Sequence, residues 1–222
     1  MTQQGSVLAA NDWQLTLAQR AYIDLKELIV TLALPPGATI READLQERLD
    51  VGRTPLREAL HRLALDGMLH IYPRRAIVVA NLGMSEVRQV FEVRLALETS
   101  AAALAAERAT SAEIAALEAL GAELSTSRSD VDVTTFLKTD QALHRAIAAY
   151  AQNALLAGYI DHIQSLSLWL WHSYFATRPL RGTDLFEHDP IVAAIAAGDA
   201  PAAAAAMSDH IRHSKEQLLT RW

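Results

Sequence analysis

The distribution of alanine is the feature that most limits the folds open to this chain. Of 41 alanines among 222 residues, 30 lie after position 80, whereas the whole chain has only nine glycines and seven prolines. Alanine is the best helix former, and glycine and proline are the worst. We therefore expect a mainly α-helical protein whose second part is built from helices alone. The length allows one or two domains with a sizeable core.

Composition excludes several classes of protein. With 51% hydrophobic and 21% charged residues, the chain is too apolar and too weakly charged to be disordered. Cysteine is absent, which excludes disulfides, thiolate metal sites and cysteine nucleophiles and fits a reducing cytoplasm. Residues 1–14 lack the basic start and apolar stretch of a targeting segment. The longest uncharged runs, 146–160 and 163–177, are shorter than the roughly 18 to 20 residues of a membrane span. We expect a cytoplasmic protein without a membrane partner.

The net charge of −6 lies entirely in the second part of the chain. Residues 1–80 hold nine basic and nine acidic side chains, whereas residues 81–222 hold 11 and 17. Within the first part, the segment 52–75 has five arginines against two acidic residues. A basic patch on an acidic protein indicates an anionic partner that binds at one end.

Apolar spacing and turn residues predict three helices and a β-hairpin in residues 1–80. The first helix has apolar residues three and four apart and ends before Pro35-Pro36-Gly37. In the third helix, Thr54 is the expected N-cap, Pro55 suits the first helical position, and Gly67 ends the helix. Three helices followed by a hairpin outline a winged helix-turn-helix domain. The expected helices are 17–32, 41–49 and 54–66, and the expected strands are 68–72 and 76–80.

The remaining chain predicts a helical bundle at residues 84–222, after a linker at Asn81-Leu82-Gly83. Small polar residues mark the helix starts, and Gly198 marks a stop. The expected fold class is therefore mainly α, with a winged helix-turn-helix followed by an all-helical bundle. The expected helices are 84–107, 111–126, 132–151, 153–177, 189–197 and 200–220, and the expected caps are Ser85, Ser111, Asn153 and Asp199.

The third predicted helix begins with two arginines on one face. Arg53 and Arg57 are four residues apart, so both side chains point the same way from the first turns. A helix N-terminus with two guanidinium groups can contact phosphates and reach guanine O6 and N7 in the major groove. Thr54 adds a hydroxyl for phosphate or base. The alternative is an ion pair on a solvated helix.

The surrounding run from Leu49 to Leu60, LDVGRTPLREAL, resembles the recognition element of the GntR superfamily. This resemblance implies a homodimer that binds double-stranded DNA at a roughly palindromic operator. It also implies that Arg74 and Arg75 form the tip of the wing. Arg41 is close to a position where the family often has a phosphate-binding arginine.

One aspartate and three histidines of the second part form a candidate metal-binding set. Asp140 and His144 are four residues apart on one helix face, and His188 and His210 lie in later segments. Taken alone, an aspartate and a histidine at this spacing more often form a helical hydrogen bond. Three neutral imidazoles and one carboxylate suit zinc, with nickel and manganese as alternatives, and leave one or two coordination positions open.

Together with Arg94, Leu95, Glu98 and the alanine-rich helix that follows, these four residues resemble the FCD effector domain of the FadR-like subgroup. Many members of that subgroup bind a divalent metal at these motif positions. An open coordination position can hold water or the carboxylate of a small organic acid. The resemblance thus implies a divalent metal bound by four residues: Asp140, His144, His188 and His210.

Three further residues are candidates for binding the effector. Arg94 can bind a carboxylate through two hydrogen bonds, or it can pair with Glu98 one helical turn away. Trp169 and His172 lie in an aromatic-rich segment and either line a cavity or fill the core and a dimer contact. Asp189 followed by Pro190 can start a helix, which would leave His188 just outside it.

We therefore predict a DNA-binding transcriptional regulator, with repression as the expected outcome, controlled by a small carboxylic acid bound at or near the metal. Two alternatives remain open. One is a metal-dependent, hydrolase-like enzyme in which the open coordination position activates water. The other is a regulator whose metal is purely structural. Enzyme activity is not expected, because no further glutamate or histidine is placed by motif as a general base.

Overall fold

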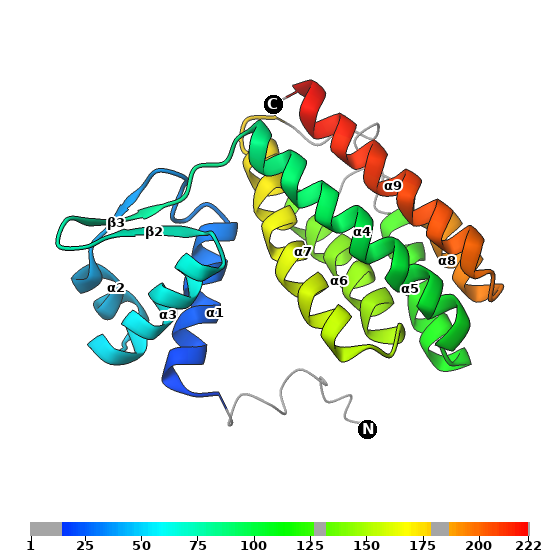
Figure 1. Cartoon of the computed structure of the whole chain (residues 1–222), viewed down its shortest axis with the longest axis horizontal. Helices are drawn as coiled ribbons and strands as arrows, with labels where there is room; N and C mark the ends of the chain where they lie inside the picture. The colour runs from blue at the N-terminus through cyan, green and yellow to red at the C-terminus, as the bar shows by residue number, and fades with distance from the viewer. Residues whose placement is uncertain (1–14, 127–131, 179–186, 222) are drawn as a thin grey trace. The chain divides into compact units, whose positions relative to one another are not determined.

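The computed structural model describes residues 15–126, 132–178 and 187–221 (Figure 1). The expectation about a targeting segment in residues 1–14 lies outside these ranges. The chain divides into two compact units, Met1–Asn81 and Leu82–Trp222, and the division falls within the expected linker.

The first unit has three helices and a small antiparallel sheet. The sheet order is β1-β3-β2, with Ile40 opposite Ile77 and Leu69 opposite Val79. The predicted two-stranded hairpin was therefore incomplete, because a strand of two residues is too short to produce a periodic pattern. The elements are α1 (Leu17–Val30), β1 (Thr39–Ile40), α2 (Glu42–Leu49), α3 (Arg53–Leu65), β2 (Leu69–Tyr72) and β3 (Ala76–Val79).

The start of α3 differs from the prediction. Gly52 is the N-cap residue and the helix begins at Arg53, so the assignment of Thr54 as N-cap was wrong. Pro55 therefore lies in the first turn but not at the first position. It is tolerated there because the first N–H groups of a helix have no intrahelical acceptor. Gly67 follows the helix with φ of 78°, a left-handed conformation that glycine adopts without strain.

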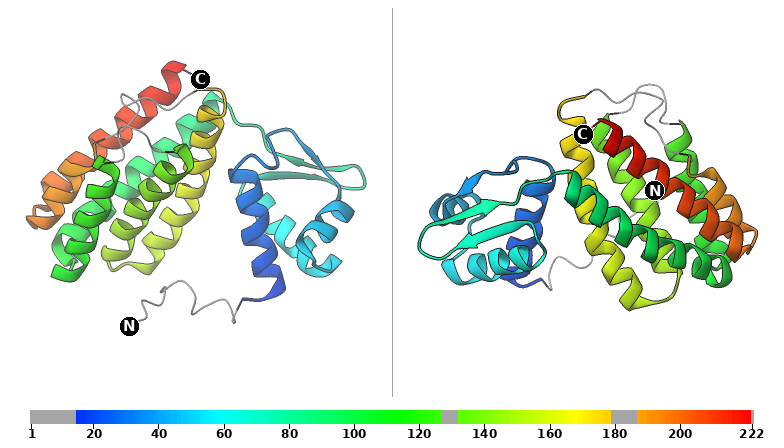
Figure 2. Two further views of the ribbon diagram at one scale, coloured as in Figure 1. Left: turned by 180° about the vertical axis from the view of Figure 1, so that it is seen from behind. Right: turned by 45° about the horizontal axis from the view of Figure 1, so that its top comes forward.

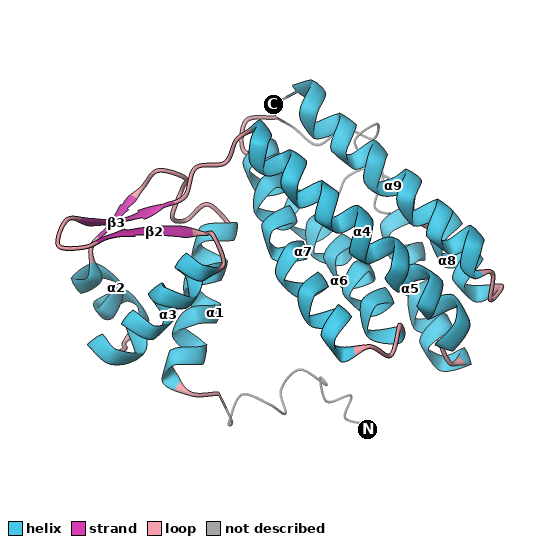
Figure 3. Cartoon of the chain, in the orientation of Figure 1, coloured by secondary structure: helices cyan, strands magenta, loops and turns pink. Residues whose placement is uncertain are grey.

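The second unit is a bundle of helices, and all strands of the described chain lie in the first unit (Figure 3). The mainly α fold class is confirmed. Helices α4 and α9 lie along each other in both views of Figure 2. None of the described helices combines the length and hydropathy that a bilayer crossing requires. The bundle helices are α4 (Met84–Arg108), α5 (Ser111–Thr126), α6 (Val133–Tyr150), α7 (Ala154–Phe175), α8 (Asp189–Ala196) and α9 (Ala200–Arg221).

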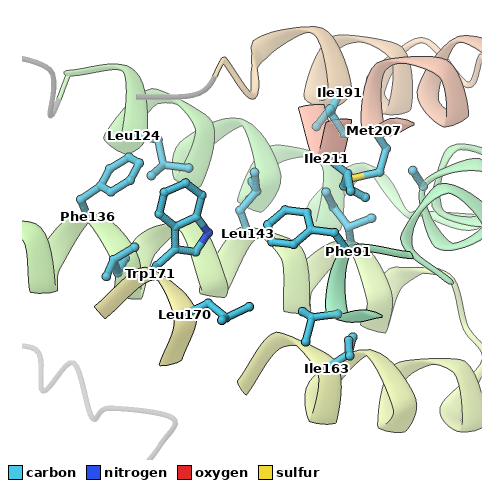
Figure 4. Packing of buried hydrophobic residues seen from close by; sticks show 14 of the residues in the cluster. Phe91, Leu124, Phe136, Leu143, Ile163, Leu170, Trp171, Ile191, Met207 and Ile211 are labelled. Carbon is cyan, nitrogen blue, oxygen red and sulfur yellow. The ribbon is translucent and has the colours of Figure 1, made fainter. Parts of the chain in front are cut away.

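The core of the bundle combines large rings with small alanines. Phe91, Phe136 and Trp171, from three different helices, point into one interior layer (Figure 4). Ala105 on α4 and Ala203 on α9 are fully buried in the same cluster. Because alanine adds little volume, these two helices can approach closely along their length. The alanine excess of the second part is thus a packing requirement as well as a helix signal.

Two of the expected caps are confirmed. The Asn153 side chain accepts a hydrogen bond from the Leu156 N–H at 3.2 Å, and Asp199 accepts one from the Ala202 N–H at 3.0 Å. Gly198 separates α8 from α9 with φ of 70°, as expected of a helix stop.

The other two expected caps were wrong by one and two residues. Helix α4 has Gly83 as its N-cap residue instead of Ser85. At α5, the Thr110 hydroxyl accepts from the Glu113 N–H at 3.3 Å, and the Glu113 carboxylate accepts from the Thr110 N–H at 2.8 Å. This capping box precedes Ser111, which is the first helical residue.

Candidate metal centre and nucleic-acid interface

The first turns of α3 carry the three residues predicted to contact DNA in a major groove. Arg53, Thr54 and Arg57 are exposed. The Arg57 Nε atom lies 3.0 Å from an oxygen of Glu42 on α2, while 61% of the Arg57 side chain remains exposed. The ion pair considered as the alternative therefore forms, with Glu42 as the partner, and leaves most of the guanidinium side chain exposed to a ligand.

The other predicted DNA-binding arginines are exposed on two separate segments of the first unit. Arg74 and Arg75 lie in the turn between β2 and β3, where Arg74 adopts a left-handed φ of 59°. The Arg75 N–H donates to the Tyr72 carbonyl at 3.0 Å and closes the turn. Arg41 is the N-cap residue of α2 and lies 4.0 Å from Asp44, with 80% of its side chain exposed.

The four predicted metal ligands converge in the interior of the bundle. Their ligand atoms all lie within 4.8 Å of one another. Asp140 and His144 come from α6 and His210 from α9, while His188 is the residue immediately before α8. His188 is therefore outside its helix, as considered above, yet it is buried and lies 2.8 Å through Nε2 from Asp140 Oδ1. The Nε2 atoms of His144 and His210 are 3.2 Å apart.

Burial and neighbouring charges set the protonation of this cluster. Burial alone raises the pKa of Asp140, but the hydrogen bond from His188 and the nearby positive charges outweigh it and lower the pKa to about 2. Burial lowers the pKa of His210 well below its usual value, and positive charge on His188 and His144 lowers it further. A carboxylate and a neutral imidazole are the forms that bind divalent metals.

A buried ion pair lies directly beside the cluster. Arg94 Nε is 2.7 Å from Glu98 Oε1, and 2% of each side chain is exposed. The other carboxylate oxygen, Oε2, lies 2.5 Å from His144 Nδ1. Burial raises the pKa of Glu98, but the Arg94 and His144 charges and their hydrogen bonds outweigh this effect and lower it to about 2. Glu98 is therefore a carboxylate in contact with one of the candidate ligands.

A small pocket opens onto the same cluster. Its cavity volume is about 10 Å³, and the surrounding empty space of about 220 Å³ includes open solvent. Two of its lining residues, Asp140 and His210, are candidate metal ligands, and Arg94 is a candidate effector-binding residue. The other lining residues are Phe136, Leu137, Trp171 and Ser214.

The two aromatic residues predicted to contact an effector do not line this pocket. Trp169 is buried with 1% of its surface exposed, while its neighbour Trp171 lines the pocket instead. His172 is half-buried, and burial followed by the charge of Lys138 lowers its pKa. Of the two interpretations of Trp169, its burial favours filling of the interior.

Comparison with known proteins assigns both units. Residues 17–79 match the family described as bacterial regulatory proteins, gntR family, and residues 89–213 match the FCD domain. The chain belongs to the GntR family. It is a transcriptional regulator with an N-terminal DNA-binding domain and a C-terminal FCD domain, and the resemblance inferred from the two sets of motif residues is confirmed.

Several GntR-family regulators are similar over most of the chain. The Nta operon transcriptional regulator of Aminobacter aminovorans is 33% identical over 150 residues, which cover 66% of this chain and 71% of that protein. The HTH-type transcriptional regulator LutR of Bacillus subtilis is 28% identical over 83% of this chain and 93% of its own length. The solved structure of McbR/YncC from E. coli has a TM-score of 0.81 and 25% identity, covering 93% of this chain and 99% of that chain.

Two residues next to the predicted sites of this GntR-family protein were not assigned a role there from the sequence. Glu98 was considered only as a partner for Arg94, although it also contacts His144. Glu42 was not considered as the partner of Arg57. No local pattern signals either contact, because each joins residues on different helices.

Proposed function

We propose that the protein represses transcription as a homodimer and that a small organic acid, bound at a divalent metal in the bundle, controls its affinity for DNA. The observation that carries this proposal is the convergence of Asp140, His144, His188 and His210 beside a pocket that also contains Arg94. This is a cation site with an anion-binding side chain next to it.

The donor set fits a divalent transition metal. Zinc bonds to imidazole nitrogen and carboxylate oxygen are about 2.1 Å long, so two donors on one ion lie at most about 4.2 Å apart. The ligand atoms here lie within 4.8 Å of one another, so small side-chain movements suffice to bring all four onto one ion. Zinc is the first expectation, with nickel and manganese as alternatives. When bound, the ion supplies a Lewis acid that can accept a carboxylate oxygen.

Arg94 supports a small anion as the effector. An arginine side chain has five N–H donors. Arg94 uses Nε for Glu98 and one Nη1 donor for Ser167, at 3.0 Å, and its other three N–H groups have no hydrogen-bond acceptor among the described residues. The cavity space beside the cluster is about 10 Å³, which holds about one water molecule, so an effector larger than that requires the lining side chains to move. A small carboxylic acid is the class of compound that matches the charge of the Arg94 side chain.

Binding of DNA is assigned to the exposed first turns of α3. In a homodimer, two copies of α3 would enter successive major grooves of a roughly palindromic operator. An effector that shifts the preferred arrangement of the bundle would change the spacing of the two DNA-binding units. Coupling of this kind typically changes affinity by about 5- to 150-fold.

Metal content tests whether the four candidate ligands bind a metal ion. After incubation with zinc and removal of unbound metal, we expect about one zinc ion per wild-type chain by elemental analysis. His210→Ala should lose this zinc, because it removes one of the four ligands. His213→Ala is a matched control, since His213 is exposed on the same helix. Asp140→Asn, which keeps the side-chain volume, should also lose zinc. Equal zinc in all four proteins would contradict the metal centre.

Binding of DNA in the presence of small acids tests whether an organic acid controls the affinity of the protein for DNA. A duplex selected by the wild-type protein from a random library serves as the operator, and fluorescence anisotropy measures its affinity. We expect at least one of malonate, succinate and citrate to weaken binding by the zinc-loaded protein. The same acid should have no effect on His210→Ala. An unchanged affinity with every acid would contradict effector control by this class.

A further inference from the structure

Glu98 connects the candidate metal centre to Arg94. It lies on α4, on which no candidate ligand lies, and 2% of its side chain is exposed. Its two oxygens have different neighbours: Oε1 lies 2.7 Å from Arg94 Nε, and Oε2 lies 2.5 Å from His144 Nδ1. The Gln164 side chain also donates to Oε2 at 2.8 Å. Three donors from α4, α6 and α7 therefore meet at one carboxylate.

This arrangement determines which nitrogen of His144 carries hydrogen. A neutral imidazole has one N–H and one lone pair, and a carboxylate can only accept hydrogen bonds. The Nδ1 atom must therefore carry the hydrogen when it faces Glu98. The lone pair is then on Nε2, which lies 3.2 Å from His210 Nε2 and 3.9 Å from Asp140 Oδ1. His144 thus turns its metal-binding nitrogen toward the other candidate ligands.

The ion pair with Arg94 does not by itself explain this contact. Arg94 and Glu98 are four residues apart on one helix, and their pair uses Oε1. The contact with His144 uses the second oxygen and joins two different helices. Glu98 therefore contacts one particular histidine of the cluster.

We propose that Glu98 is a positioning residue of the metal centre, which holds His144 with hydrogen on Nδ1 and its Nε2 lone pair toward Asp140 and His210. This inference rests on the proposed metal site and adds an outer residue to it. Carboxylates that accept a hydrogen bond from a metal-binding histidine fix its tautomer and orientation, and their loss typically weakens metal binding by about 10- to 100-fold.

Glu98→Gln tests the proposal with little change in volume. The amide has one acceptor oxygen where the carboxylate has two, so it cannot accept from both Arg94 and His144 in the same way. Competition with a chromophoric chelator measures the zinc affinity of the full-length protein. We expect Glu98→Gln to bind zinc about 10- to 100-fold more weakly than wild type. Glu107→Gln is the matched control, because Glu107 is exposed on the same helix, and it should bind zinc as wild type does.

The tautomer of His144 gives a measurement that a purely structural role would not change. Long-range ¹H–¹⁵N correlation spectra of the metal-free protein distinguish hydrogen on Nδ1 from hydrogen on Nε2, and the signals of His144 are those lost in His144→Ala. We expect hydrogen on Nδ1 in the wild type and a shift toward Nε2 in Glu98→Gln. Hydrogen on Nε2 in the wild type would overturn the proposal, even if Glu98→Gln does not fold.

The outcomes also separate this inference from the proposed function. If wild-type protein binds zinc and Glu98→Gln binds it equally tightly, the role of Glu98 is wrong and the metal centre stands. If wild-type protein binds no zinc, the proposed metal centre is wrong, and the inference that rests on it is overturned as well.

Discussion

At the scale of single residues, Arg57 pairs with Glu42 and is also the proposed partner of a DNA phosphate, so the two groups would compete for its charge. It pairs with Glu42 at 3.0 Å, but 61% of its side chain remains exposed. Exposed ion pairs contribute about 0 to 1 kcal/mol, so a DNA phosphate can displace the carboxylate at little cost. Glu42 also places a negative charge where a phosphate would approach. If Arg57 contacts DNA as proposed, the ion pair would affect the strength of DNA binding more than the stability of the fold.

Two substitutions test this competition in opposite directions. Arg57→Ala should weaken binding to the selected duplex and lower the log–log salt slope by about 0.9, because one phosphate contact is lost. Glu42→Gln should strengthen binding, because it removes a competing carboxylate and keeps the side-chain size. Fluorescence anisotropy over a series of salt concentrations measures both effects. Arg212→Ala, an exposed arginine of the bundle, is the control. Unchanged affinity and salt slope for Arg57→Ala would show that α3 is not the recognition helix.

At the scale of helices and strands, local signals predicted the elements well and their first residues less well. The apolar spacing located α1 to α3 and the bundle helices, because it repeats over many residues. Glycine and proline residues marked several of the helix ends. The caps at Asn153 and Asp199 were predicted correctly, whereas Ser85 was not a cap. A cap depends on the backbone angles of one residue, and several polar residues near a helix start can satisfy the same sequence pattern.

The difference between a true and an apparent cap is measurable. Asn153→Ala should lower the free energy of unfolding of the bundle by about 1 kcal/mol, because the Leu156 N–H loses its acceptor. Ser85→Ala should change it by less than about 0.5 kcal/mol, since the exposed Ser85 hydroxyl only accepts from Gln89. Urea unfolding followed by tryptophan fluorescence reports on the bundle, because three of the four tryptophans lie after position 82. Equal losses in both variants would contradict this assignment of caps.

At the scale of the whole molecule, the two candidate sites lie in different compact units. All four candidate metal ligands and Glu98 lie in residues 82–222, and all six candidate DNA-binding residues lie in residues 1–81. The negative net charge belongs to the second unit, which leaves a neutral first unit with an arginine-rich segment. Control of one unit by a ligand of the other therefore requires coupling between units that have separate cores.

This division predicts that the bundle binds metal without the DNA-binding unit. A fragment of residues 82–222 should fold and bind zinc as tightly as the full chain, because every candidate ligand is present. Zinc at 100 times its Kd should stabilise the fragment by about 2.7 kcal/mol, measured by urea unfolding with and without the metal. The same fragment carrying His210→Ala is the control and should show no stabilisation. A fragment that folds but does not bind zinc, while the full-length protein does, would contradict this division into two units.

The extent to which the sites were predictable follows from the distance between their residues along the chain. Arg53, Thr54 and Arg57 were identified because they share one short motif, and their exposure follows from their place at a helix start. The resemblance to the FCD domain named the four candidate metal ligands, although only Asp140 and His144 have a local spacing that brings them together. The contact between Glu98 and His144 had no sequence signal, because it joins two helices whose relative rotation depends on packing.

Helix propensity, turn residues and charge are properties of neighbouring residues, so the sequence by itself determined the helical class, the order of the helices and the division of charge between two parts. Only the tertiary structure decided which side chains meet. It brings His144 and His210, 66 positions apart, to 3.2 Å, and it turns the other nitrogen of His144 toward Glu98. The physical reason is that the packing of alanines and large rings between the bundle helices sets the distances and rotations of those helices. These distances and rotations place four donors from three separate segments around one point.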